Sequence, residues 1–230
     1  MKDYKIIYEF QYSDGSKKVY SLVLDAKTTS LKIEKKKQLP EWTKLECGKC
    51  SMCPLNEKDD PRCPLAVNIS DLVESFKDER STDNVLVKIQ VPERAFVKTA
   101  SVQDGLYSIL GVVMATSDCP NMNFLKPMAR FHLPFSTSEE TVFRSTSIHL
   151  LRQYFAYKKG EELDLDLQKL NDHYKKVQNV NQGILQRMST VYKKGDANQN
   201  ALVILDAFAK VLTMDIEDQL QSMEYLFGDK

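Results

Sequence analysis

The C-terminal part of the chain carries the feature that most constrains the fold, an apolar repeat with alternating spacings of four and three residues. It begins at Leu163, ends at Val191 and includes Asn181 at one core position. This heptad spacing places every member on one side of a helix. A buried Asn in such a seam can fix the register of two helices. The sequence therefore predicts a long helix with one continuous contact face.

A second helix of the same kind is predicted directly after the first. Lys193, Lys194 and Gly195 supply cations and a glycine of the kind that ends a helix. The apolar repeat resumes at Leu202 and continues to Phe227. Because the connection is short, the two helices are expected to be antiparallel neighbours. We therefore predict a long antiparallel helical hairpin over residues 163–227.

The N-terminal part has the pattern of β-structure. Residues 4–12 alternate between apolar and polar side chains, and a second run covers 18–24. Between them lie Asp14 and Gly15, a strong signal for a hairpin turn. A third strand is expected near residues 30–33. The opening is therefore predicted to be a small antiparallel β-meander.

The middle of the chain predicts a mixture of short elements. A helix is expected from the N-cap candidate Ser70 to Phe76, with strands over 85–91 and 95–99. A buried helix is expected to start at Ser101. Thr137 and Glu140 form a capping-box pattern, which predicts a helix to Tyr157.

These elements predict an α+β fold. A β-rich region over 1–100 contains the cysteine lobe at 40–68, and a helical region follows over 101–230. Together the parts make an N-terminal antiparallel β-meander with a four-cysteine metal lobe, then a mainly helical part that ends in the hairpin.

The cysteine lobe is the clearest candidate site. Cys47, Cys50 and Cys53 are separated by two residues each, and Cys63 follows in the same irregular segment. Four thiolates this close in sequence can surround one tetrahedral ion, and the two-residue spacing lets both ends of a tight turn reach the same metal. Four thiolates leave no open coordination position, so the predicted role is structural zinc rather than catalytic zinc.

Two alternatives remain open for the same cysteines. Three cysteines at two-residue intervals with a more distant Cys-Pro pair also suit an iron–sulfur cluster, and both Cys63 and Cys119 precede a proline. Disulfides or free thiols are the other alternative. The lobe alone resembles the structural zinc lobe of medium-chain alcohol dehydrogenases, although no dinucleotide-binding fingerprint accompanies it. Cys119 has no assigned role.

Residues 119–136 form an irregular segment that could line a ligand pocket. Its candidate ligand-binding residues are Lys126, Arg130 and His132. An anion such as phosphate is the ligand to test first, because the helix predicted at Thr137 begins nearby. The competing interpretation is that apolar neighbours anchor the segment to the core. His149 and His173 are expected to be packed or surface residues.

Composition and motifs exclude several functions. The 230 residues hold 32 basic and 32 acidic side chains, so bulk electrostatic attraction to nucleic acid or membrane is not expected. No apolar run approaches the length of a membrane-spanning helix, and the first residues lack the apolar stretch of a signal peptide. We therefore expect a cytoplasmic protein. Because no common catalytic motif is present, no catalytic residues are assigned.

The order of a β-meander, the cysteine lobe and a helical remainder resembles an uncharacterised bacterial family of unknown function. The resemblance implies a bacterial protein and no known activity. Our first hypothesis is a non-enzymatic protein with a structural zinc site, which acts through a protein partner or through self-association of the hairpin into a dimer. The alternatives are an iron–sulfur redox or sensing protein, and a ligand-binding protein or enzyme that uses segment 119–136.

Overall fold

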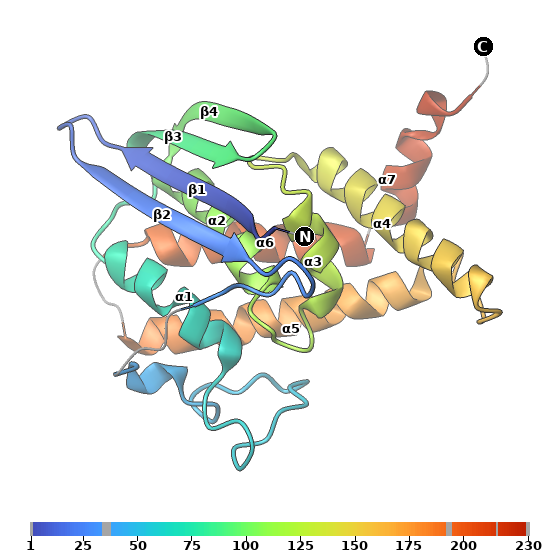
Figure 1. The fold of residues 1–230 in the computed structure, drawn as a ribbon, viewed down its shortest axis with the longest axis horizontal. Coiled ribbons are helices and arrows are strands. Elements are labelled where there is room, and N and C mark those ends of the chain that lie inside the picture. Colours follow the sequence, from blue (N-terminus) through green and yellow to red (C-terminus); the bar gives the residue numbers. More distant parts are fainter. Residues whose placement is uncertain (1, 34–37, 192–194, 215, 229–230) are drawn as a thin grey trace.

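The computed structural model describes residues 2–33, 38–191, 195–214 and 216–228, and it leaves out the side chains of 190 and 191. The predicted helix stop at Lys193 and Lys194 therefore lies outside the described residues, and the side chain of the seam position Val191 is not described. The described chain forms a four-stranded sheet covered on one side by helices (Figure 1).

The sheet is antiparallel throughout, with the strand order β2-β1-β3-β4. The strands are β1 (Tyr4–Gln11), β2 (Lys17–Leu24), β3 (Asn84–Val91) and β4 (Arg94–Ser101). The predicted N-terminal hairpin is confirmed, with Tyr4 opposite Leu24. Ile6, Tyr8 and Phe10 are fully buried, as their alternation indicates.

The third strand predicted at 30–33 is wrong. Leu31 forms only an isolated bridge with Leu24, and its N–H donates to the Thr116 carbonyl at 2.8 Å. The other edge of β1 is occupied by β3, which comes from much later in the sequence. The segment at Leu31 therefore fastens the end of the hairpin to a helix instead of extending the sheet.

The first helix starts earlier than predicted. Helix α1 covers Pro64–Ser75, with Cys63 as its N-cap and Pro64 in the first turn. Proline fits that position because it lacks an N–H that would otherwise need a partner. Ser70, the expected N-cap, lies in the buried interior of the helix.

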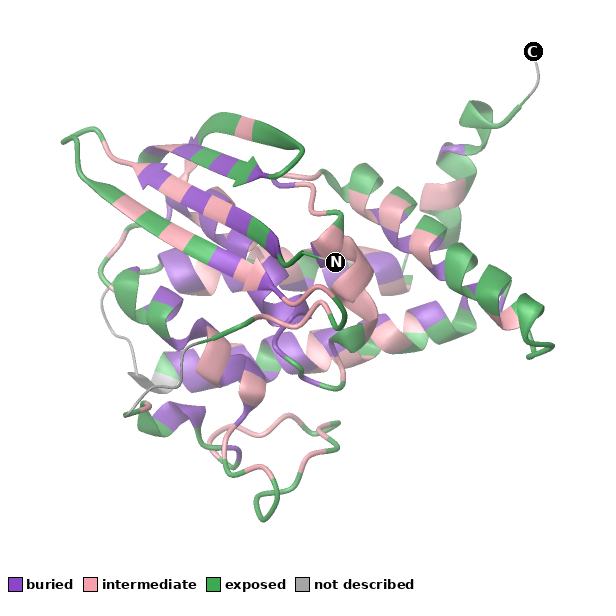
Figure 2. Ribbon diagram, viewed as in Figure 1, coloured by how far each residue is buried: buried purple, intermediate pink, exposed green. Residues whose placement is uncertain are grey.

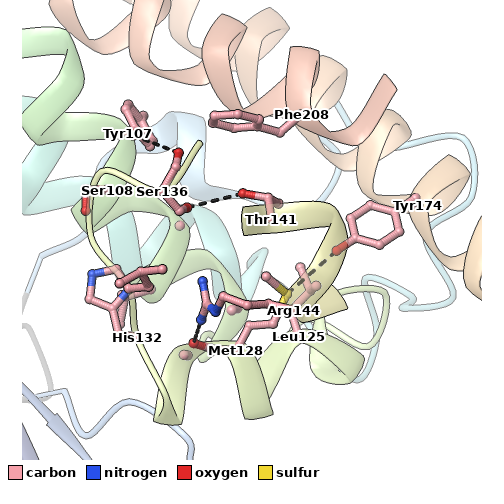
Figure 3. A pocket seen from close by; sticks show the side chains of 15 residues that line it. Tyr107, Ser108, Leu125, Met128, His132, Ser136, Thr141, Arg144, Tyr174 and Phe208 are labelled. Atoms are coloured by element: carbon pink, nitrogen blue, oxygen red, sulfur yellow. Dashed lines mark hydrogen bonds between the residues drawn. The ribbon is translucent and has the colours of Figure 1, made fainter. Parts of the chain in front are cut away.

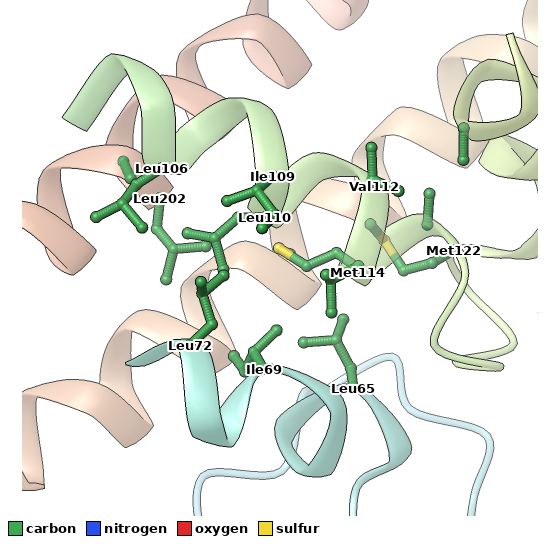
Figure 4. Packing of buried hydrophobic residues seen from close by; sticks show 14 of the residues in the cluster. Leu65, Ile69, Leu72, Leu106, Ile109, Leu110, Val112, Met114, Met122 and Leu202 are labelled. Atoms are coloured by element: carbon green, nitrogen blue, oxygen red, sulfur yellow. The ribbon is translucent and has the colours of Figure 1, made fainter. Parts of the chain in front are cut away.

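Helix α2 (Val102–Ala115) lies at the centre of the core. The Ser101 side chain accepts a hydrogen bond from the Asp104 N–H, which confirms the predicted cap. Figure 4 shows the contact of α2 with α1 and the C-terminal hairpin, where buried leucine and isoleucine side chains from all three meet. These include Leu72, Ile109 and Leu202, each at most 4% exposed. Burial of a leucine or isoleucine contributes about 2 kcal/mol, so this contact stabilises the whole arrangement.

The C-terminal hairpin is confirmed as α5 (Gln168–Val191) packed along α6 (Ala197–Met214). The buried seam of α5 includes Tyr174, Asn181 and Ile184. Helix α5 begins at 168 rather than at Leu163, which is 38% exposed.

The C-terminal end differs from the predicted continuous helix. Residues Ile216–Ser222 form a separate short helix, α7, followed by a 3₁₀ turn, η3 (Glu224–Leu226). Figure 1 shows α7 turned away from the direction of α6 and close to α4. The predicted seam residue Phe227 is 72% exposed.

Helix α4 (Ser138–Lys158) confirms the predicted capping box: Thr137 accepts from the Glu140 N–H, and Glu140 accepts from the Thr137 N–H. Before it come η2 (Asn123–Leu125) and α3 (Lys126–Arg130), whereas η1 (Glu41–Thr43) lies in the cysteine lobe. No helix in the described ranges has the length and apolar character needed to cross a membrane.

Candidate functional site

The cysteine lobe is attached to helix α5 by a buried arginine. Arg187 is 1% exposed, and its Nη1 donates to the Trp42 and Lys44 carbonyls at 2.7 and 2.6 Å. Its Nη2 donates to the Leu45 carbonyl at 2.8 Å. Figure 1 shows η1 and the long loop after it on the outer side of α5. The Arg187 side chain of the hairpin therefore fixes the path of the backbone where the cysteine lobe begins.

The cysteine loop also lies close to the middle of α5. A Cβ added to Gly183 would lie 2.6 Å from Cys50 Sγ, so only glycine leaves room for this thiol. Asn179 accepts from the Met52 N–H at 3.0 Å. From the other side, the Asn121 amide donates to the Met52 carbonyl at 3.0 Å. The loop is thus held between α5 and the turn that contains Cys119.

The thiols of the lobe influence one another electrostatically. All five cysteines are free. Burial raises the pKa of Cys50 to about 11, with smaller contributions from Cys63 and Cys53, while Arg187 acts in the opposite direction. Burial also raises the pKa of Cys119 to about 12, with contributions from Cys63, Cys50 and Cys53. The structure therefore brings Cys119 into the neighbourhood of three of the predicted ligands, whereas the sequence offered it only through the Cys119-Pro120 pair of the iron–sulfur alternative.

The predicted four-cysteine metal site is not formed in this structure. No group of three or more His, Cys, Asp or Glu side chains within the described ranges is arranged to hold an ion. Metal binding normally organises the ligands of such a site as it displaces their protons. The site at Cys47, Cys50, Cys53 and Cys63, and the identity of its metal, remain predictions.

The three candidate ligand-binding residues of segment 119–136 have different contacts and do not form one site. Lys126 donates to Asp118 at 2.7 Å and to Ser30 at 2.8 Å. Arg130 stacks on Tyr4, with its guanidinium carbon 3.9 Å from the ring centre. Of the three, His132 alone lines the cavity described next. The nearby start of α4 is occupied by its own Glu140 carboxylate, 2.8 Å from the Thr137 N–H, which disfavours a phosphate there.

A cavity of about 130 Å³ lies between α2, the α3 segment, α4 and the hairpin (Figure 3). Its walls are largely apolar. The lining residues are Tyr107, Ser108, Gly111, Val112, Ala115, Leu125, Met128, Ala129, His132, Leu133, Ser136, Thr141, Arg144, Tyr174 and Phe208. A mostly apolar cavity with a few convergent polar groups is typical of a small-molecule site.

The polar side of this cavity contains a buried hydrogen-bond chain and one cation. The Tyr8 hydroxyl pairs with His132 Nε2 and with the Ser108 hydroxyl. Burial lowers the pKa of His132 to about 3, with a further contribution from Arg144, so the imidazole is neutral at pH 7. Arg144 Nη2 donates to the Phe131 carbonyl at 2.7 Å. Arg144 was not among the residues predicted from the sequence.

The other two histidines have packing roles, as predicted. His149 is 3% exposed and lies 2.9 Å from an Asp164 carboxylate oxygen, so it holds the connection between α4 and α5. His173 stacks on Phe124 with ring centres 4.6 Å apart.

The outward side of α4 is unusually apolar for a helix at the surface. Figure 2 shows mostly exposed residues along its outer half. We call the following exposed residues of α4 and the C-terminal turn the α4 outer face: Leu150, Leu151, Tyr154, Phe155, Tyr157, Tyr225, Leu226 and Phe227. A solvated helix face normally carries polar residues, and apolar side chains gathered in this way indicate a contact surface.

The fold and these sites define an α+β protein with a cysteine lobe attached to a helical hairpin. The family model that covers residues 6–228 is a domain of unknown function, DUF6901. The chain belongs to this family, which agrees with the expected membership of a family of unknown function, whereas the match shows neither a bacterial origin nor a likeness to a zinc lobe. No curated protein and no solved structure matches the chain.

Proposed function

We propose that this protein acts by association rather than by catalysis, and that a structural zinc ion stabilises its cysteine lobe. The α4 outer face carries the association, and the occupant we propose is a second copy of the chain. The zinc is held by Cys50, Cys53 and Cys63 with a fourth thiol, which is Cys47 by sequence spacing or Cys119 by position in the fold.

The observation that supports association is the position and size of the exposed apolar side chains. Phe155 and Tyr157 are 55% and 66% exposed, and Phe227 is 72% exposed. Single exposed apolar residues are common, but large ones rarely gather on one helix and an adjacent turn of a monomer. Grooves of about 300 and 400 Å³ between α4 and residues 220–227 would receive side chains from a partner.

Replacing two central residues of this face tests the proposal. We expect the wild-type chain to be dimeric in light scattering, and Leu151→Glu with Phe155→Glu to be monomeric, because a dimer would bury two carboxylates on each copy. Val97→Glu is the matched control, since Val97 is 61% exposed on β4, away from this face. A monomeric wild type, or a double variant that still dimerises, would contradict self-association.

The support for zinc is the spacing of Cys47, Cys50, Cys53 and Cys63 within a loop that has little core of its own. The cysteine lobe is attached to the rest of the protein through hydrogen bonds of Arg187, Asn179 and Asn121. A structural metal commonly supplies the missing stability in such a segment.

Elemental analysis of the purified full chain tests the zinc site. We expect about one zinc per chain, and loss of that zinc in Cys50→Ser with increased proteolysis between residues 40 and 68. Cys47→Ser and Cys119→Ser separate the two candidates for the fourth ligand, and the variant that keeps zinc is the control for the substitution itself. A brown preparation containing iron would overturn zinc in favour of an iron–sulfur cluster.

A further inference from the structure

The cavity beneath α4 combines apolar walls with a single positive charge. Val112, Leu125 and Phe208 are among its apolar walls, whereas Arg144 reaches it from α4. In Figure 3 the guanidinium lies between His132 and Met128. The cavity contains no residue of the α4 outer face or of the cysteine lobe, but Leu133 and Arg144 also line the groove of about 300 Å³.

The guanidinium of Arg144 has donors to spare. Its Nη2 donates to the Met128 and Phe131 carbonyls at 3.1 and 2.7 Å. Among the described residues, no acceptor is hydrogen-bonded to Nη1 or Nε of Arg144. Within the same residues, no carboxylate oxygen lies within 4 Å of its guanidinium nitrogens. Glu140 acts on the charge of Arg144 from beyond ion-pair distance, and its carboxylate accepts from the Thr137 N–H. An arginine without a directly paired carboxylate favours an anionic ligand, because arginine pairs with a carboxylate through two parallel N–H groups.

We propose that this cavity binds a small monocarboxylate with a short apolar tail, its carboxylate paired with Arg144 and its tail against the walls at Val112, Leu125 and Phe208. The size of the cavity sets the size of the ligand. A volume of about 130 Å³ approaches the roughly 150 Å³ of a cavity known to accept benzene. The tail is therefore an aliphatic chain of a few carbons or one small ring.

The remaining polar groups favour a single negative charge. His132 is neutral, and burial raises the pKa values of Tyr107 and Tyr174 to about 12, so their hydroxyls are also neutral. The Ser136 and Thr141 hydroxyls already pair with each other at 3.2 Å. One cation beside apolar walls matches a monocarboxylate better than phosphate, which would bring up to two charges and no apolar surface.

Calorimetric titration of the full chain tests this proposal with three probes: sodium butyrate, butyramide and sodium phosphate. Butyramide has the shape of butyrate without its charge, and phosphate has charge without the tail. We expect butyrate to bind at least about tenfold more tightly than either. Equal binding of butyramide, tighter binding of phosphate, or no binding of butyrate would each overturn the proposal.

Two variants locate the site. Arg144→Gln removes the charge and is expected to weaken butyrate binding by about tenfold or more. Ala115→Leu fills the cavity from α2 without touching the charge, and it should abolish binding. Thermal unfolding of both variants checks that they are folded. If Arg144→Gln does not fold, Ala115→Leu decides, and unchanged butyrate binding in that variant would place the ligand elsewhere.

Discussion

His132 shows how the fold changes the chemistry of a single residue. Its ring nitrogen is paired with the buried Tyr8 hydroxyl, and burial lowers its pKa from 6.5 to about 3. In the unfolded chain the same imidazole is in water. The two states of the protein therefore bind protons differently, which links its stability to pH.

We predict that acid destabilises the protein partly through His132. Between pH 6.5 and about 3 the unfolded chain binds a proton that the folded His132 does not, so the free energy of unfolding falls as the pH is lowered through this range. The contribution is about 3 kcal/mol by pH 4. Urea unfolding at several pH values measures it. His132→Gln should flatten the profile, whereas His173→Gln should leave most of it, and equal slopes for the wild type and His132→Gln would contradict the assignment.

Sequence reasoning found some of the important residues and missed others for a physical reason. The spacing of Cys47, Cys50 and Cys53 is local, so it is visible along the chain. Arg144 and Arg187 have no such signal, because each acts on carbonyl groups from distant segments. Nothing in the sequence distinguishes them from arginines on a solvated helix face.

For the secondary-structure elements, the sequence predicts the first residue of a helix correctly where a side chain caps that helix. Thr137 and Glu140 satisfy each other's backbone N–H groups, so the start of α4 follows from four adjacent residues. Helix α1 was placed too late, although Pro64 directly after Cys63 is a helix-start signal. The cysteine spacing indicates an irregular lobe over the same residues, and this conceals the helix-start signal.

Helix ends and partners are less predictable than helix starts. The apolar repeat that continues to Phe227 is compatible with one long helix, but α7 is separate and lies near α4. The repeat shows that these residues are apolar, but it does not indicate which surface of the protein they pack against. This is why the exposed α4 outer face appears only in the folded chain.

At the scale of the whole molecule, Arg187 joins two regions that lie far apart in sequence. It holds the carbonyls of Trp42, Lys44 and Leu45, more than 140 residues away. We predict that Arg187→Met lowers the free energy of unfolding by about 3 kcal/mol, because three buried carbonyls lose a charged donor. Chemical denaturation measures this loss, and proteolysis should show cleavage within residues 38–63.

Lys175→Met is the control for that change. Lys175 lies on α5, as Arg187 does, and pairs with Asp172; both side chains are more than half exposed, at 57% and 66%, so its loss should cost less than about 1 kcal/mol. Equal stability of Arg187→Met and the wild type would show that the lobe is held by its other contacts.

The sequence by itself determined the α+β class, the N-terminal hairpin, the cap of α4 and the C-terminal helical hairpin. Each depends on spacing within a few residues, where strand alternation, capping and heptad periodicity are set by backbone geometry. Tertiary structure alone decided that β3 pairs with β1, that Cys119 lies near Cys50 and Cys63, and that Arg144 lines a cavity. These contacts join segments whose separation along the chain carries no periodic signal, so only packing of the whole core brings them together.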